Sequence, residues 1–135
     1  MDKKESVLID SDVLINFFDK SKKFNLVAEN AFFDFEKKDI QLCVSVITVI
    51  EMIQGNKTNI EKNRIIKQLE SFYNIPISDE ISKSAKDLII NYSSSHGLLL
   101  ADAFIAATAL LLNLKLFTFN KKDFKFIKAL DLYEP

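Results

Sequence analysis

Acidic side chains are the residues best suited to chemistry in this sequence. Asp10-Ser11-Asp12 directly follows a short apolar run, and a strand end next to a helix start is a suitable place to hold a metal ion or a phosphate. Asp102 lies in an apolar stretch, where burying an unpaired carboxylate costs several kcal/mol. Asp102 therefore needs a metal ion, a cluster of donors or water. The simpler alternatives are that Ser11 or Asp12 only caps the following helix, and that Asp102 bonds its own helix N-terminus.

Two further motifs carry acidic or amide side chains. Glu51 ends Thr48-Val49-Ile50-Glu51, which also has the form of a helix capping box. Asn120 and Asp123 follow an apolar run near the C-terminus and are turn residues by default. Taken together, these residues are oxygen ligands without a strong His or Cys candidate, and such a set selects Mg²⁺ or Mn²⁺ rather than zinc. Cations of this kind most often handle phosphates and can drive phosphodiester hydrolysis.

Composition removes most other catalytic machinery. The chain has 135 residues with two glycines, one cysteine and one histidine. Gly55 and Gly97 are far apart, which excludes a dinucleotide-binding glycine motif, a Walker-type phosphate loop and a nucleophile elbow. Cys43 is alone in an apolar run and is expected to be buried, so a cysteine-rich zinc site is excluded. The single histidine, His96, is expected on the loop before the Asp102 helix and not as a catalytic group.

Short apolar runs alternate along the chain with longer helical stripes. Strands are expected at residues 6–10, 41–45 and 114–119, with further short strands at 74–77 and 130–133. Thr58 and Ser78 are the expected caps of two helices. The apolar stripes predict one helix that begins at Val13, one helix after each of these two caps, and helices at 24–38, 100–113 and 123–129. A loop is expected at 93–97.

This alternation predicts an α/β fold, a sandwich around a mostly parallel sheet. No internal repeat or linker interrupts the sequence, so residues 1–135 are expected to form a single domain. Ligands of such sheets bind outside the carboxyl ends of the strands. Asp10 ends the first strand and Asn120 ends a late one, so both are expected at that edge.

The ordered set of motifs resembles PIN-domain ribonucleases, especially VapC-type toxins. Residues 8–15 look like the opening motif of that family, 45–55 like its second, 100–110 like its third and 116–124 like its closing strand and turn. The resemblance covers essentially the whole chain. It implies a three-layer α/β/α sandwich, metal-dependent endoribonuclease activity on RNA, a small antitoxin partner and a homodimer.

The resemblance also implies site residues. Asp10, Glu51 and Asp102 match the first three members of an acidic quartet that binds Mg²⁺ or Mn²⁺, and these would be the catalytic residues. The fourth place is open between two residues, because Asn120 stands where many relatives have Asp or Asn and the nearby Asp123 could supply the charge. The side chains expected to orient these ligands from outside are Ser11, Asp12 and Thr118.

Charge and the N-terminus bound the setting of the protein. The formal net charge is −1, from 18 basic and 19 acidic side chains, so no polybasic coat is present, although lysines gather at 20–23 and 121–128. The first residues carry mixed charges without a signal-peptide core, and no apolar stretch is long enough to span a membrane, so a cytoplasmic protein is expected. The alternatives are a catalytically silent PIN-like module that binds RNA or a partner, and a phosphorelay receiver-like domain. The sequence does not identify the RNA target.

Overall fold

The computed structural model describes residues 4–135, and a four-stranded parallel sheet forms its centre. The strands lie in the order β3-β2-β1-β4. They are β1 (Ser6–Ile9), β2 (Gln41–Ser45), β3 (Tyr73–Ile75) and β4 (Lys115–Phe117). The helices are α1 (Ser11–Phe18), α2 (Asn25–Lys37), α3 (Val46–Gln54), α4 (Asn59–Leu69), α5 (Asp79–His96) and α6 (Leu100–Leu112), with a short 3₁₀ helix η1 (Lys121–Asp123).

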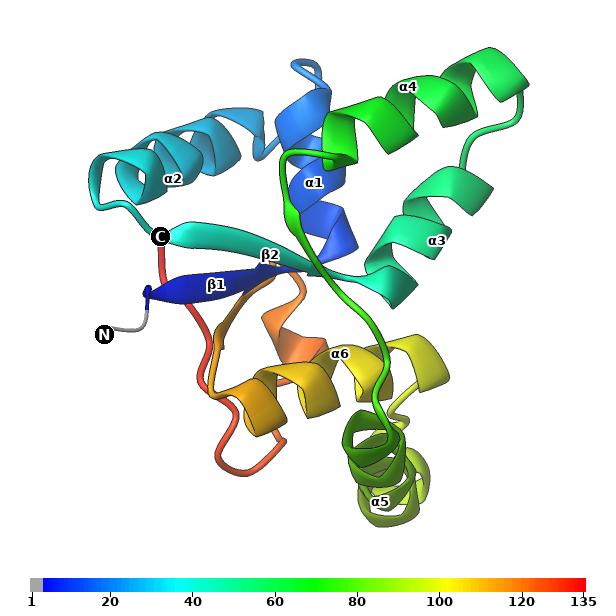
Figure 1. Cartoon of the computed structure of the whole chain (residues 1–135). Helices are drawn as coiled ribbons and strands as arrows, with labels where there is room; N and C mark the ends of the chain where they lie inside the picture. The colour runs from blue at the N-terminus through cyan, green and yellow to red at the C-terminus, as the bar shows by residue number, and fades with distance from the viewer. Residues whose placement is uncertain (1–3) are drawn as a thin grey trace.

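The middle of the sheet is buried on both faces because the central residues of β1, β2 and β4 are apolar. Successive residues of a strand point to opposite faces. Leu8 and Leu116 pack in a core with α5 and α6, whereas Val7, Ile9 and Phe117 pack in a second core with α1 and α2. Figure 1 shows these helices on the two sides of the sheet. The three-layer α/β/α fold class is confirmed.

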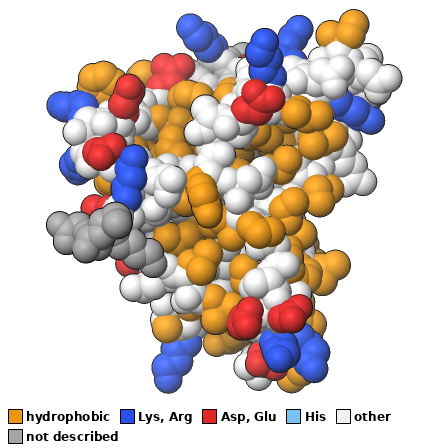
Figure 2. Space-filling model, viewed as in Figure 1, with side chains coloured by type: hydrophobic (Ala, Val, Ile, Leu, Met, Phe, Trp, Pro, Cys, Tyr) orange, Lys and Arg blue, Asp and Glu red, His pale blue; other side chains and the backbone are white. Residues whose placement is uncertain are grey.

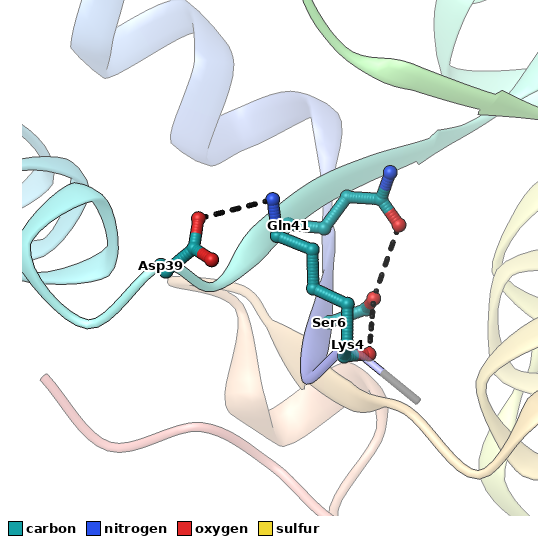
Figure 3. A network of polar contacts seen from close by, with 4 residues as sticks. All are labelled: Lys4, Ser6, Asp39 and Gln41. Carbon is teal, nitrogen blue, oxygen red and sulfur yellow. Dashed lines mark hydrogen bonds and ion pairs between the residues drawn. The ribbon is translucent and has the colours of Figure 1, made fainter. Parts of the chain in front are cut away.

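The strand register is fixed at the amino edge of the sheet by polar contacts (Figure 3). Ser6 pairs with Gln41 in the β1–β2 register, and the Ser6 hydroxyl donates to Gln41 Oε1 over 3.3 Å. Lys4 Nζ lies 3.1 Å from Asp39 Oδ1 at the turn that leads into β2. This exposed ion pair stabilises little. These contacts lie at the amino edge of the sheet, opposite the candidate site at the carboxyl edge, and they concern the alignment of β1 with β2.

The chain order around β1 creates a crevice at the carboxyl edge. β1 lies in the middle, with β2 on one side and β4 on the other. The helices after β1 cover one face, and α6, which precedes β4, covers the opposite face. In open α/β sheets, ligands bind where the connections diverge in this way. The residues that follow β1, β2 and β4 therefore meet at a place suited to a ligand.

The sequence located the strands at 6–10, 41–45 and 114–119 correctly: β2 has the predicted bounds, β1 is one residue shorter and β4 is three residues shorter. The strand expected at 74–77 forms at Tyr73–Ile75. The two caps at Thr58 and Ser78 are confirmed, since each side chain accepts a hydrogen bond from a backbone N–H of its helix. Cys43 is buried as expected. The first helix begins two residues earlier than predicted, at Ser11, because Asp10 caps it.

Three predictions near the ends of elements are wrong. Residues 93–96 continue helix α5 instead of forming a loop, and Gly97 ends that helix in the left-handed conformation at φ +69°. Residues 124–129 form turns, in which Ile127 N–H donates to Phe124 O, because the spacing of two buried residues that suggested a helix also suits successive turns. The strand expected at 130–133 is reduced to one parallel bridge between Leu116 and Leu132.

The phenylalanines mostly serve the interior. Of the 12 in the sequence, only Phe24 and Phe33 are classed as exposed. Phe35 and Phe117 are fully buried and pack edge to face with their ring centroids 6.0 Å apart. Within residues 4–135, no helix combines the length and the apolar character that crossing a bilayer requires.

Candidate active site

Asp10 lies at the centre of the carboxyl edge because it joins β1 to α1. Its backbone N–H extends the sheet by donating to Phe117 O over 3.0 Å. Its side chain caps α1, with Oδ1 accepting from Ser11 N–H at 2.9 Å. The residue is 6% exposed. A strand end that is also a helix N-cap therefore fixes the Asp10 carboxylate, and the alternative that Ser11 or Asp12 supplies this cap is wrong.

Thr118 links the carboxyl ends of the neighbouring strands β1 and β4. It follows β4 directly and is almost completely buried. Its hydroxyl donates to Asp10 Oδ2 at 2.9 Å and accepts from Asn120 N–H at 3.0 Å. Asp12 Oδ2 accepts from Phe119 N–H at 3.0 Å. The segment after β4 thus holds both aspartates of the Asp10-Ser11-Asp12 motif in place.

Glu51 comes to the site on α3, which starts directly after β2. Ser45 caps this helix by accepting from Ile47 N–H at 3.1 Å. The capping-box interpretation of Thr48 and Glu51 is therefore wrong, because the helix begins before Thr48. Residues three apart on a helix lie on the same face, so the helix places Thr48 beside Glu51. The buried Thr48 hydroxyl has no hydrogen-bond partner among the residues that the structure describes.

Asp102 reaches the site from the first turn of α6. The helix starts after Leu99, which offers no side-chain cap. Asp102 could have bonded the free N–H groups of this end, but within residues 4–135 its carboxylate accepts no hydrogen bond from them. It is half-buried and has spare acceptor capacity. The helix terminus still favours a negative charge there through its dipole.

The carboxylates of the site raise one another's pKa. Burial, followed by the charge of Asp10, raises the pKa of Asp12 to about 7. Burial and then the charges of Asp10, Asp123 and Glu51 raise the pKa of Asp102 to about 6. The pKa values of Asp10 and Glu51 are also raised, first by burial. None of these four shifts is opposed by a lysine or arginine charge, so the edge carries concentrated negative charge.

The family model of the PIN domain matches residues 7–130. The chain belongs to the PIN domain family. Ribonuclease VapC10 of Mycobacterium tuberculosis is 34% identical over 125 residues, which cover 92% of this chain and 90% of that protein. A toxin-antitoxin complex from Klebsiella pneumoniae contains a chain of 33% identity and TM-score 0.72, with 96% of this chain and 99% of that chain covered. VapBC2 from Rickettsia felis, bound to a promoter DNA fragment, shares the fold at TM-score 0.76 and 20% identity over 95% and 97% of the two chains.

This PIN domain brings the sequence-predicted site residues to one edge of the sheet. Asp10 precedes α1, Glu51 lies in the second half of α3 and Asp102 lies in the first turn of α6. The charge of Asp10 contributes to the raised pKa of both Glu51 and Asp102, and the charge of Glu51 contributes to that of Asp102. Asp123 belongs to the same set through its charge, although its side chain is exposed. Asn120 is exposed and contributes its backbone N–H to Thr118. Ser11 contributes its backbone N–H to Asp10.

Two buried hydroxyl residues of this PIN domain were missed as site residues by sequence reasoning. Ser45 and Thr48 are both fully buried at the start of α3. The available signal was the Ser-x-x-Thr-x-x-Glu spacing, in which Ser45 ends a strand and Thr48 and Glu51 are three residues apart on the following helix. The capping-box pattern explains Thr48 as a helix cap, so the sequence does not indicate that Thr48 is buried near the candidate site.

The donor set fits a hard divalent cation in its chemistry. The negative charge is uncompensated, the ligand atoms are oxygens, and the Thr48 hydroxyl next to Glu51 is buried without a partner. Within residues 4–135, however, no three His, Cys, Asp or Glu side chains are already gathered closely enough to hold a metal ion. Mg²⁺ typically keeps several waters and takes only one or two carboxylates. The arrangement therefore suits a hydrated ion better than one enclosed by protein ligands.

Proposed function

We propose that this chain is an endoribonuclease that hydrolyses RNA phosphodiester bonds and acts as the toxin of a toxin–antitoxin pair. The observation that carries the proposal is the group of mutually coupled carboxylates at the carboxyl edge, which no lysine or arginine charge opposes. The similarity to a VapC ribonuclease over nine-tenths of the chain supports the same activity. We also propose that residues 1–135 act as one domain.

We propose that Asp10, Glu51 and Asp102 hold one Mg²⁺ or Mn²⁺ ion, with Asp123 or Asn120 in the fourth place. When bound, the ion would lower the pKa of a water and stabilise negative charge on the phosphate. The chain itself supplies position. Ser11 N–H and the Thr118 hydroxyl fix both oxygens of Asp10, and α3 and α6 carry the other two carboxylates to the edge. Asp12, held by Phe119 N–H, orients the same edge.

The partners that we propose are RNA, a small antitoxin protein and a second copy of the chain, in the cytoplasm. A groove of about 880 Å³ lies between α2 and the strands β2 and β3, and both apolar and charged side chains line it. Phe33 on its wall is 65% exposed. Figure 2 shows apolar side chains across the middle of the molecule, with charged side chains toward its margins. Exposed apolar surface of this kind is typical of protein–protein contacts.

A second candidate function is a catalytically silent module that binds RNA or a partner. It is favoured by one observation, the absence within residues 4–135 of three acidic side chains already gathered to hold a metal ion. Titration with Mn²⁺ separates the two candidates. An active nuclease must bind the ion at the acidic edge, whereas a silent module would show no binding.

The decisive test is cleavage by the purified protein. We expect it to cleave a mixture of cellular RNA in Mn²⁺ or Mg²⁺ and to stop when EDTA is added. Asp102→Asn should abolish cleavage while the far-ultraviolet circular dichroism is unchanged, because the substitution removes a charge and keeps the shape. Asp79→Asn, in the first turn of α5, is the matched control and should cleave like the parent. Parental cleavage by Asp102→Asn would show the assignment to be wrong.

A further inference from the structure

Three aromatic rings meet at the C-terminal end of α5. His96 is the last residue of this helix, and its ring stacks on Phe126 with centroids 4.4 Å apart and only 9° between the planes. Tyr92, one turn earlier, meets both rings at steep angles, 5.7 Å from His96 and 5.4 Å from Phe126. The Tyr92 hydroxyl accepts from Lys128 N–H at 3.4 Å. The stack therefore joins α5 to the segment that follows η1.

Within residues 4–135, Phe126 is the only aromatic ring stacked on a face of the exposed His96 ring. Phe126 covers one face, and Tyr92 is too close to Phe126 to lie on top of the pair, so it stands beside the stack. Ser95 Oγ lies 2.7 Å from His96 Nδ1, which occupies the edge of the ring. The residue is classed as exposed, and no further aromatic ring contacts it among residues 4–135. A flat ring with a fixed orientation thus presents one face to solvent.

The surface around the stack is basic. Lys122, Lys125 and Lys128 are all exposed and form no ion pair within the described part of the chain. Lys125 and Lys128 flank Phe126 on both sides in the sequence. The only acidic residue between positions 121 and 128 is Asp123, which belongs to the candidate active site. The segment that carries Phe126 therefore bears exposed positive charge, on a protein whose net charge is −1.

The residues of the stack are close along the chain to two carboxylates of the acidic edge. Phe126 is three residues beyond Asp123, so their Cα atoms are at most about 11 Å apart. His96 ends the helix that leads through residues 97–99 into α6, whose first turn carries Asp102. The two segments that form the stack, the end of α5 and the turns after η1, are thus each connected through a few residues to a segment that carries a site carboxylate. If one phosphate of a nucleic acid strand is held at the acidic edge, a nearby nucleotide of the same strand could reach the rings.

We propose that the open face of His96, supported by Phe126 and Tyr92, is a stacking platform for a base of single-stranded RNA, with the flanking lysines contacting its phosphates. Surfaces that bind single strands combine stacking rings with cations in this way, and every base offers a flat face. A protein partner would also be able to cover the rings, but the three unpaired lysines favour a polyanion. The inference rests on the proposed ribonuclease function and names residues that position its substrate.

The test measures RNA binding and stacking separately. A 12-nucleotide single-stranded RNA that carries 2-aminopurine is titrated, with Mg²⁺ present, into the Asp102→Asn protein so that the RNA stays intact. We expect the base to lose fluorescence as it stacks. Adding His96→Ala should remove this quenching and weaken binding about tenfold or more. His96→Phe, which keeps a flat ring, should restore both. Leu111→Ala, an exposed apolar change at the far end of α6, is the control and should change neither.

Cleavage kinetics provide the second measurement. In the otherwise unmodified protein, His96→Ala should raise KM and change kcat less, because the platform binds substrate and does not touch the reacting phosphate. Parental affinity and quenching in His96→Ala, or failure of His96→Phe to restore them, would overturn the platform even if Asp102→Asn abolishes cleavage. A protein that neither binds nor cleaves RNA would overturn the proposed function and the platform together. Loss of protein binding alone in His96→Ala would assign the surface to a protein partner instead.

Discussion

Asp10 and Thr118 show how single side chains prepare this site. Both oxygens of Asp10 accept hydrogen bonds, from Ser11 N–H and from the Thr118 hydroxyl, and these bonds favour its charged form. Burial nevertheless outweighs them, because the pKa of Asp10 is raised. The carboxylate is therefore held in a fixed orientation while its charge remains uncompensated. A cation would compensate the negative charge of the Asp10 carboxylate, and for this reason we expect one at this position.

Substitution of Thr118 tests this arrangement. Thr118→Val keeps the shape but removes the donor to Asp10 and the acceptor for Asn120 N–H. Leaving buried groups without partners should cost about 1–3 kcal/mol of unfolding free energy, measured in urea. Cleavage should fall about 10- to 100-fold, as for other groups that orient metal ligands. Thr118→Ser keeps the hydroxyl and should recover most of both. Equal activity in the valine and serine variants would contradict a positioning role.

At the scale of elements, three helices deliver the carboxylates, with Asp10 and Asp102 at the starts of α1 and α6 and Glu51 further along α3. α1 and α3 each begin directly after a parallel strand, and α6 begins after a three-residue connection from α5. Parallel strands place their carboxyl ends at one edge, so the helices that follow them begin at that edge. The sheet positions these helix starts, and contacts between the helices are not required. The sequence predicted the ends of β1 and β2 well, because short apolar runs are local signals, and it placed Asp10 correctly at the end of the first.

Sequence reasoning failed where local signals have two interpretations. The serines at 93–95 suggested a loop, but serine is tolerated in helices and Gly97 provides the actual stop. Thr48 and Glu51 fit a capping box, but Ser45 starts the helix one turn earlier. The contact between His96 and Phe126 joins residues 30 positions apart in the sequence, and neither periodicity nor composition indicates such a pairing. Tertiary packing decides each of these cases.

The two glycines provide a matched test of the α5–α6 junction. Gly97 has a φ of +69°, so Gly97→Ala should destabilise the fold by about 1–2 kcal/mol even though the added Cβ would meet no atom within 4 Å. Gly55, with a φ of −71°, has the ordinary helical conformation, and its added Cβ would lie 3.4 Å from Glu51 O. Gly55→Ala should therefore be neutral or stabilising by less than about 1 kcal/mol. Urea unfolding of the two variants measures the difference, and equal effects would contradict the conformational argument.

At the scale of the whole molecule, the charge distribution matters more than the total. The net charge of −1 hides a strong separation. Asp10, Asp12, Glu51, Asp102 and Asp123 are five of the 19 acidic side chains, which leaves 14 acidic against 18 basic side chains elsewhere. A bound divalent ion would neutralise part of the acidic edge, and the remaining surface would attract a polyanion.

The same charges make stability depend on pH and on cations together. The folded pKa values of Asp12, about 7, and Asp102, about 6, lie above the ordinary value of 3.8. Protonation therefore favours the folded state, and in EDTA the stability from these groups should be full below about pH 4 and lost as pH rises through 6 to 7. A cation binds the ionised carboxylates, so its stabilising effect should increase over the same range.

Thermal unfolding in Mn²⁺ and in EDTA tests this coupling. We expect the rise in Tm caused by Mn²⁺ to be larger at pH 7.5 than at pH 5, because protons compete with the ion for the same oxygens. At 100 times the Kd the ion should add about 2.7 kcal/mol of unfolding free energy. Asp102→Asn should reduce this gain at pH 7.5, whereas Asp79→Asn should keep it, because the charge of Asp79 contributes to none of the raised pKa values of the site. A Tm shift that is the same at both pH values would mean that Mn²⁺ binds elsewhere, and the acidic edge would then lose its role as the cation site.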